Sequence, residues 1–108
     1  MKSFDKTTIM QELKSLLLKN FPGKIEKILL FGSRATGHAK KYSDYDVLLV
    51  LNGSYDWRLK NKVLSSCYEI DLKYDILLDV KIISHGELST LRGKQPFILN
   101  ALEYGVAV

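Results

Sequence analysis

Cysteine is almost absent from this chain, and long hydrophobic runs are missing altogether. The single cysteine, Cys67, excludes an internal disulfide framework and a zinc site built from cysteines, and its place among the apolar positions of an expected helix predicts burial. No apolar run approaches the roughly 18 residues that a membrane-spanning helix requires. The first residues, 1–13, include acids and no small-residue cleavage site, unlike a signal peptide. We therefore expect a cytoplasmic protein without membrane association.

Histidine and linker-type sequence are also scarce. Neither His38 nor His85 has a second potential ligand at metal-binding spacing, so both are expected on the surface. No internal repeat or Pro/Gly/Ser-rich linker divides the 108 residues, which predicts one domain over residues 1–108. The formal net charge of +4 suits a polyanionic partner, although many solvated domains share it. Because no aromatic and basic platform of known form is present, direct nucleic-acid binding is not expected.

What the chain does contain is an alternation of amphipathic and apolar segments. Apolar residues at three- and four-residue spacing predict helices, and continuous apolar runs predict strands buried on both faces. The expected helices cover residues 5–19, 33–39, 56–72 and a segment after Pro96, and the expected strands cover 24–31, 44–51 and 76–83. Ser84 and Glu87 have the spacing of a capping box, which predicts the start of another helix. This order of elements indicates an α/β or α+β domain with a small mixed sheet flanked by helices.

Two carboxylates stand at the head of the second expected strand. Asp44 and Asp46 are separated by one residue, so in a strand they would point to the same face, roughly 7 Å apart. Carboxylates in such positions can hold oxygen-preferring divalent ions. Two divalent cations roughly 4 Å apart can stabilise both the attacking and the leaving oxygen in a displacement at phosphorus. The alternative is that these acids cap the strand or lie on the surface without further function.

A third acid from a neighbouring strand would complete such a site, and Asp79 is the preferred candidate. It interrupts an apolar strand, where an unpaired carboxylate is costly and a bound metal would remove that cost. Asp75, four residues earlier, is a rival, but it follows Tyr74 at an expected turn into the strand. Asp79 could instead be a solvent-facing acid on an edge strand.

The first strand ends in a Gly32-Ser33 turn that leads into the expected short helix. Backbone N–H groups and a hydroxyl in that place can bind terminal phosphates. Arg34, Lys40 and Lys41 are the nearby cations, and each could equally be a solvated surface residue. A Gly-Ser turn after one apolar run, followed by two acids at the head of the next, predicts a segment that grips a metal-bound polyphosphate.

The sequence of residues 32–50 carries a resemblance to a known family. Its G-S-R-A-T-G, five further residues and S-D-Y-D-V-L-L-V resemble the signature of the DNA polymerase β-like nucleotidyltransferase superfamily, and most closely that of its smallest prokaryotic members, the minimal nucleotidyltransferases. The fixed positions of that signature correspond to Gly32, Ser33, Ala35, Gly37, Ser43, Asp44 and Asp46. Asp79 matches the third acid of the family by context. The segment PFILNALEYGVAV, residues 96–108, resembles the family's C-terminal helix.

The resemblance implies a fold, a reaction and a set of site residues. The fold would be a mixed sheet flanked by helices, and the reaction would be transfer of a nucleoside monophosphate from an NTP, expected to be ATP, with release of pyrophosphate. Two Mg²⁺ ions would take part. The family pattern assigns catalysis and metal binding to Asp44, Asp46 and Asp79, and nucleotide binding to Gly32, Ser33, Arg34 and Ser43.

The resemblance also implies a partner. Minimal nucleotidyltransferases are commonly encoded beside helical HEPN-type proteins, and some act as antitoxins that adenylylate a tyrosine of a HEPN ribonuclease. The short segment after the third expected strand, residues 84–108, is too small for an acceptor domain, so we expect the acceptor hydroxyl on a partner protein. The alternative is a catalytically inactive module of the same fold that binds and masks its HEPN-type partner.

Overall fold

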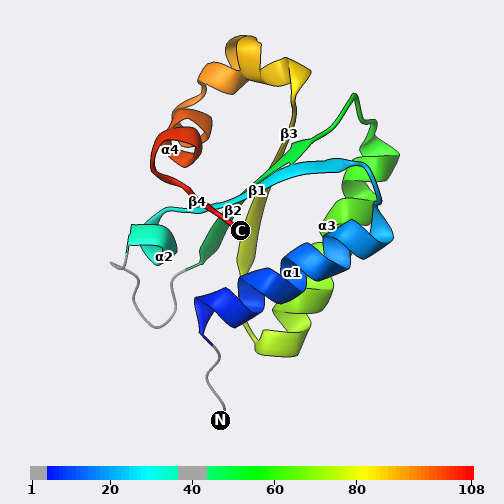
Figure 1. The fold of residues 1–108 in the computed structure, drawn as a ribbon, viewed down its shortest axis with the longest axis vertical. Coiled ribbons are helices and arrows are strands. Elements are labelled where there is room, and N and C mark those ends of the chain that lie inside the picture. Colours follow the sequence, from blue (N-terminus) through cyan, green and yellow to red (C-terminus); the bar gives the residue numbers. More distant parts are fainter. Residues whose placement is uncertain (1–4, 37–43) are drawn as a thin grey trace.

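The computed structural model describes residues 5–36 and 44–108, which form a four-stranded mixed sheet with helices on both faces (Figure 1). The elements in chain order are α1 (Lys6–Asn20), β1 (Ile25–Phe31), α2 (Ser33–Thr36), β2 (Tyr45–Leu51), α3 (Trp57–Tyr74), β3 (Leu78–Ser84), the 3-10 helices η1 (Gly86–Ser89) and η2 (Leu91–Lys94), α4 (Pro96–Tyr104) and β4 (Val106–Ala107). The strand order is β3-β2-β1-β4, with β2 and β3 parallel and the other pairs antiparallel. The predicted mixed sheet flanked by helices is confirmed. None of the helices in the described ranges has the length and apolar character needed to cross a membrane.

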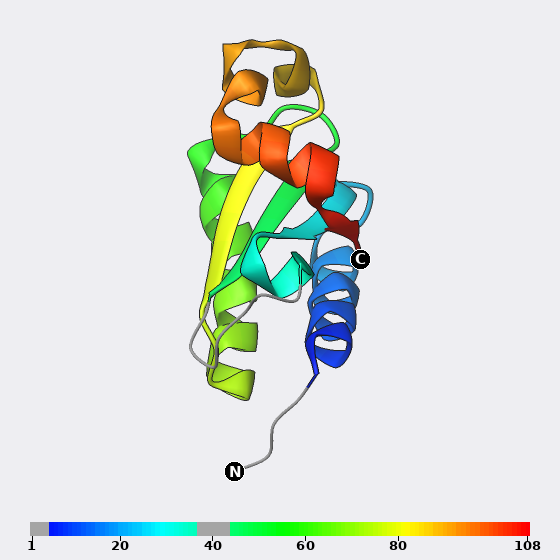
Figure 2. The same ribbon diagram turned by 90° about the vertical axis from the view of Figure 1, so that its left-hand side faces the viewer.

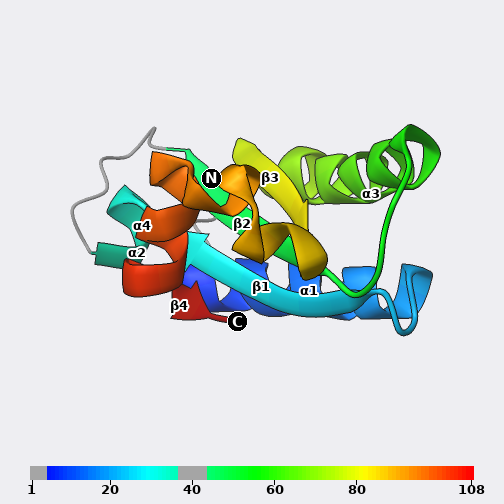
Figure 3. The same cartoon turned by 90° about the horizontal axis from the view of Figure 1, so that it is seen from above.

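The sheet is buried on both faces because its central strand is apolar at nearly every position. Val47, Leu49 and Leu51 of β2 pack toward α1 and α3, while Leu48 and Val50 pack toward α4. All five are at most 1% exposed, and burying such a side chain stabilises a fold by roughly 1.5–3 kcal/mol. Figures 2 and 3 show α4 lying across the strands on the face opposite to α1 and α3. Cys67 of α3 is buried in the larger core, as predicted.

The two long helices, α1 and α3, each begin directly after an aspartate whose side chain caps the helix. Asp5 accepts a hydrogen bond from the backbone N–H of Thr8 at 2.7 Å, and Asp56 accepts one from Leu59 at 2.9 Å. Each aspartate satisfies a backbone donor that has no partner within its helix. Both helices therefore start one residue after the predicted positions, directly behind their caps.

Several predicted boundaries differ from the structure. The strand expected over 44–51 begins at Tyr45, so Asp44 precedes it. The strand expected over 76–83 covers Leu78–Ser84, because α3 continues to Tyr74 and Asp75 follows in a left-handed conformation with φ 53°. The helix expected over 33–39 is described only as Ser33–Thr36, and the rest of that prediction lies outside the described residues.

The predicted capping box is present, but it begins a different element. Ser84 Oγ accepts from the Glu87 N–H at 3.3 Å, and Glu87 Oε1 accepts from the Ser84 N–H at 3.0 Å. The segment that follows forms two 3-10 helices instead of the expected α-helix. A Cβ atom at Gly93 would lie 2.2 Å from the Leu88 carbonyl oxygen, which shows how tightly these turns pack. The strand β4 was not predicted; its two residues pair with Leu29 and Leu30 of β1.

Candidate functional site

Asp46 and Asp79 lie side by side at the beginnings of two parallel strands. Asp46 is the second residue of β2, Asp79 is the second residue of β3, and the two are register partners. Since register partners in a sheet present their side chains on one face, both carboxylates lie on the face that α4 partly covers. Asp44 directly precedes β2 and is exposed. The structure thus brings together the acids that the sequence placed about thirty residues apart.

The rival acid, Asp75, lies outside strand β3. It is the exposed residue that ends α3, and its left-handed backbone places it in the turn before the strand. An aspartate tolerates this conformation better than most residues with a side chain. Asp75 therefore has a local structural role, while Asp79 is the acid beside Asp46.

The end of β1 lies next to Asp46, on the side of β2 opposite to β3. Phe31 pairs with Asp46 across the antiparallel β1 and β2 strands, and the chain turns at Gly32 with φ +72°. A Cβ atom built on Gly32 would lie only 2.3 Å from Asp46 Oδ2. The glycine is required both by the left-handed turn and by the close approach of the carboxylate. Its carbonyl oxygen accepts a hydrogen bond from the N–H of Ala35 at 3.1 Å, which starts α2.

Burial and like charge act together on Asp46. Burial raises the pKa of the Asp46 carboxyl, the charges of Asp79 and Asp44 raise this pKa further, and Lys81 opposes them. Each cause is the expected one, because both a dry environment and a neighbouring anion disfavour the ionised form. The charges of Asp44 and Asp79 therefore act on Asp46 at the beginnings of β2 and β3, and this arrangement favours a bound cation.

The described acidic side chains are not arranged as a complete metal site. Within residues 5–36 and 44–108, no three His, Cys, Asp or Glu side chains are placed so that they could hold a metal ion. Asp79 instead pairs with Lys81, whose Nζ lies 3.4 Å from Asp79 Oδ1. The donors have the chemistry that Mg²⁺ prefers, and gathering them requires Asp79 to leave Lys81.

The remaining predicted nucleotide contacts are only partly described. Arg34 lies in α2 with its guanidinium carbon 4.4 Å from the centre of the Tyr45 ring, and its carbonyl oxygen accepts from Lys6 Nζ at 2.9 Å. Ser33 is the first residue of α2. Ser43 lies outside the described residues, as do Lys40 and Lys41. The structure therefore places Gly32 against the acids and leaves the contacts of the other residues as predictions.

Lys81 was missed in the sequence. It follows Asp79 by two positions and shares its face of β3, and its ammonium group also lies 5.6 Å from the centre of the Phe97 ring on α4. The signal was available, because a lysine two residues after a strand acid must point the same way. Its pairing with Phe97 depends on α4 and was not readable from the sequence.

The sequence matches one protein family over most of its length. The family described as "Polymerase beta, Nucleotidyltransferase" matches residues 11–94. Two proteins of Methanocaldococcus jannaschii that are named as candidate protein adenylyltransferases are each 32% identical to this chain. MJ0604 aligns over 89% of this chain and 90% of its own length, and MJ0141 over 93% and 95%.

Solved structures share the fold at lower identity. A toxin–antitoxin structure with AMP-PNP matches with a TM-score of 0.61 at 22% identity, over 90% of this chain and 69% of the matched chain. A structure of the tri-AMPylated Shewanella oneidensis HEPN toxin in complex with the MNT antitoxin matches with a TM-score of 0.56 at 20% identity, over 94% and 69%. A nucleotidyltransferase candidate from Sulfolobus solfataricus matches with a TM-score of 0.57 at 21% identity, over 93% and 76%.

Proposed function

This chain belongs to the polymerase β nucleotidyltransferase family and is a nucleotidyltransferase, and we propose that it transfers the AMP moiety of ATP to a hydroxyl group on a partner protein. The observation that carries the proposal is the register pairing of Asp46 with Asp79, with Gly32 packed against the Asp46 carboxylate. In the reaction, the acceptor oxygen forms a bond to the α-phosphorus. The bond from that phosphorus to the bridging oxygen breaks, and pyrophosphate leaves.

Asp44, Asp46 and Asp79 are the residues that would hold two Mg²⁺ ions. The raised pKa of Asp46, caused by burial and by the two neighbouring acids, supports this role because a cation would relieve the repulsion. Bound Mg²⁺ would neutralise charge that develops on the phosphate oxygens. Asp79 would also accept or orient the proton of the acceptor hydroxyl, since its side chain is 44% exposed and an acceptor can approach it.

The turn after β1 would hold the phosphates of the nucleotide. Gly32 and Ser33 present backbone there, Arg34 adds a positive charge, and Ser43 precedes the acids along the chain. Successive backbone N–H groups in such turns form concave anion sites. The left-handed Gly32 supports this assignment, because it lets the chain pass within contact distance of Asp46.

The proposed acceptor is a HEPN-type helical protein, and the proposed setting is a cytoplasmic toxin–antitoxin pair in which residues 1–108 act as one domain. Support comes from the relatives named as protein adenylyltransferases. A neighbour in fold was solved with AMP-PNP, and another with an AMPylated HEPN toxin.

A transfer assay tests the proposal directly. Labelled ATP, Mg²⁺ and the HEPN-type partner should give a labelled partner protein, and EDTA should abolish the label. Asp79→Asn should lose the activity, while Asp75→Asn is the matched control, because this residue lies four positions away in a turn outside the strand. No label on the partner at any Mg²⁺ concentration, with both proteins folded, would refute the proposal.

A second candidate function follows from the pairing of Asp79 with Lys81. If that pair persists when nucleotide is present, the chain would mask its partner by binding and perform no chemistry. The doubly substituted Asp44→Ala/Asp46→Ala variant separates the two candidates. Continued inhibition of the partner by this variant supports masking, and loss of inhibition supports transfer.

A further inference from the structure

Strand β3 forms an edge of the sheet. Within residues 5–36 and 44–108, the strand order places only β2 next to it. The carbonyl oxygen of Leu77 accepts from Tyr45, and the N–H of His85 donates to Leu51, both at 2.9 Å. Odd-numbered residues thus turn their backbone groups toward β2. Because these groups alternate along a strand, Leu78, Val80, Ile82 and Ser84 turn theirs away from the sheet.

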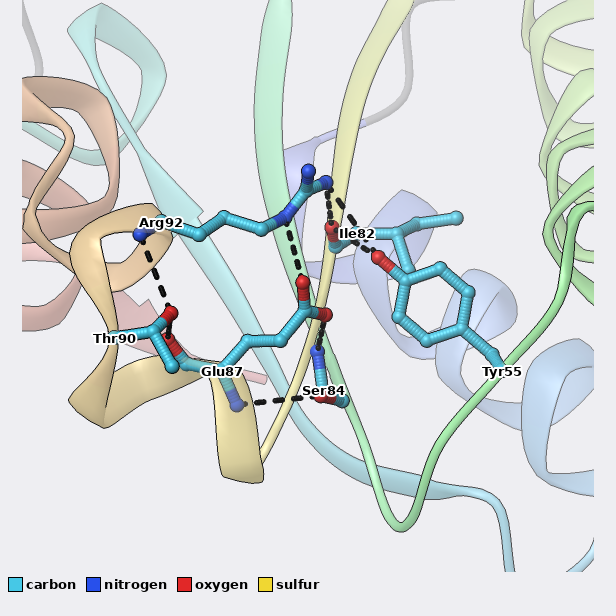
Figure 4. A network of polar contacts seen from close by, with 6 residues as sticks. All are labelled: Tyr55, Ile82, Ser84, Glu87, Thr90 and Arg92. Carbon is cyan, nitrogen blue, oxygen red and sulfur yellow. Dashed lines mark hydrogen bonds and ion pairs between the residues drawn. The ribbon is translucent and has the colours of Figure 1, made fainter.

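Both ends of this edge are closed by side chains. At the start, the N–H of Leu78 donates to Asp71 Oδ1 at 3.1 Å. Near the other end, the Ile82 carbonyl oxygen accepts from Arg92 Nη2 at 3.1 Å and from the Tyr55 hydroxyl at 3.2 Å, as Figure 4 shows. Glu87 holds the Ser84 N–H and pairs with Arg92, with Nε to Oε2 at 3.2 Å. Such closure prevents unrestricted strand pairing along an edge.

The middle of the edge is open at Val80. Across residues 5–36 and 44–108, no hydrogen bond engages the outward N–H or C=O of Val80. The flanking closures confine this opening to a short stretch, and the opening lies one residue from Asp79. An edge with a gap of this length next to catalytic acids is suited to one short extended segment.

A groove surrounds the opening, with walls from both layers of the fold. We call it the β3-edge groove, and it is lined by Lys60 and Leu64 of α3, Val80, Lys81 and Ile82 of β3, Arg92 of η2, and Phe97 and Ile98 of α4. Lys81 faces Asp79, and Arg92 faces Glu87. Lys60 has no acidic partner in the described ranges. The groove therefore carries a surplus positive charge beside apolar side chains.

We propose that the β3-edge groove binds an extended, acidic segment of the acceptor protein as an added strand, which presents its hydroxyl to Asp79. This inference rests on the proposed function. Neighbouring strands lie about 4.8 Å apart, so a side chain of the added strand on the α4 face would stand beside Asp79 and Lys81. An acidic side chain of the segment would pair with Lys60, and another would meet Lys81 once Asp79 turns to a bound cation.

The test uses the full chain and the capped peptide Ac-Glu-Glu-Tyr-Glu-Glu-NH2, whose alternating residues place acids on both faces of the added strand, two toward Lys60 and two on the face of Lys81. On saturation, the amide of Val80 should shift in NMR spectra, and its hydrogen exchange should slow by about tenfold or more as it gains a bond. Lys60→Glu should weaken binding by about tenfold because it removes the complementary charge. Lys62→Glu, an exposed change on the same helix that is not part of the groove, is the matched control and should bind normally.

Three results would overturn the inference. The first is unchanged exchange at Val80 with the peptide at about 1 mM, the range of weak association. The second is equal binding of the same peptide with lysine in place of glutamate, and the third is equal weakening by the Lys60 and Lys62 variants with both folded by circular dichroism. Docking without transfer from ATP to the peptide tyrosine would count against the proposed function alone. Transfer without protection of Val80 would count against docking alone.

Discussion

The close approach of Gly32 to Asp46 gives the sharpest prediction about this protein. In Gly32→Ala, the new Cβ atom would lie 2.3 Å from Asp46 Oδ2, whereas ordinary contacts begin near 3.4 Å. The carboxylate must therefore retreat by about 1 Å, and misplacement on that scale in an active site lowers a rate by roughly 100-fold. We expect the transfer of nucleotide to the partner to fall by about this factor.

The same substitution also strains the backbone, so its effect on stability must be separated from its effect on activity. An alanine at φ +72° costs about 1–2 kcal/mol, and a loss of about 1 kcal/mol lowers the melting temperature of a domain of this size by roughly 4 °C. Gly23→Ala is the matched control. Gly23 has φ +76°, but a Cβ atom there would meet nothing within 4 Å.

Thermal denaturation and initial transfer rates, measured on both variants below their melting temperatures, complete the experiment. Both variants should lose similar stability, and only Gly32→Ala should lose the transfer rate. A Gly32→Ala protein with a wild-type rate would refute the reasoning, because it would show that the position of the Asp46 carboxylate is unimportant. Equal loss of rate in both variants would assign the effect to backbone strain.

Three further predictions follow from single side chains. Burial and neighbouring acids raise the pKa of Asp46 in the folded protein above its value in the unfolded chain. Ionisation of Asp46 therefore destabilises the fold as the pH rises from the unfolded-chain pKa through the folded-state pKa. Asp46→Asn should be more stable than wild type in urea at neutral pH, and the difference should vanish well below pH 3.8, the ordinary pKa of an aspartate. Burial raises the pKa of Cys67 to about 12, so a thiol reagent at neutral pH should react only after unfolding, and reaction at the rate of a free thiol would contradict this. Arg92→Ala removes the bonds to Ile82 and Glu87 and should lower the free energy of unfolding by about 1 kcal/mol, whereas Lys94→Ala, an exposed change in the same η2 helix, should leave it unchanged.

The prediction of the fold succeeded where burial is continuous. The apolar run of β2 is buried along its length from Val47 to Leu51, so its sequence alone indicated a central strand. The aspartates that begin α1 and α3 act within three residues, and such local bonds are readable from spacing. Strand β4 was missed because its two residues form a strand only through their pairing with the distant strand β1.

The candidate site, like the fold, was predicted only in part from the sequence. The sequence by itself determined the Gly-Ser turn, the two acids beside it and the apolar strands that carry them, because turn conformation and burial are properties of a few neighbouring residues. Only the tertiary structure decided that Asp79 and not Asp75 stands beside Asp46, that Asp79 pairs with Lys81, and that the edge of β3 is open at Val80. These features depend on the register of β2 and β3. That register joins segments about thirty residues apart, and a shift of one residue would turn Asp79 to the opposite face.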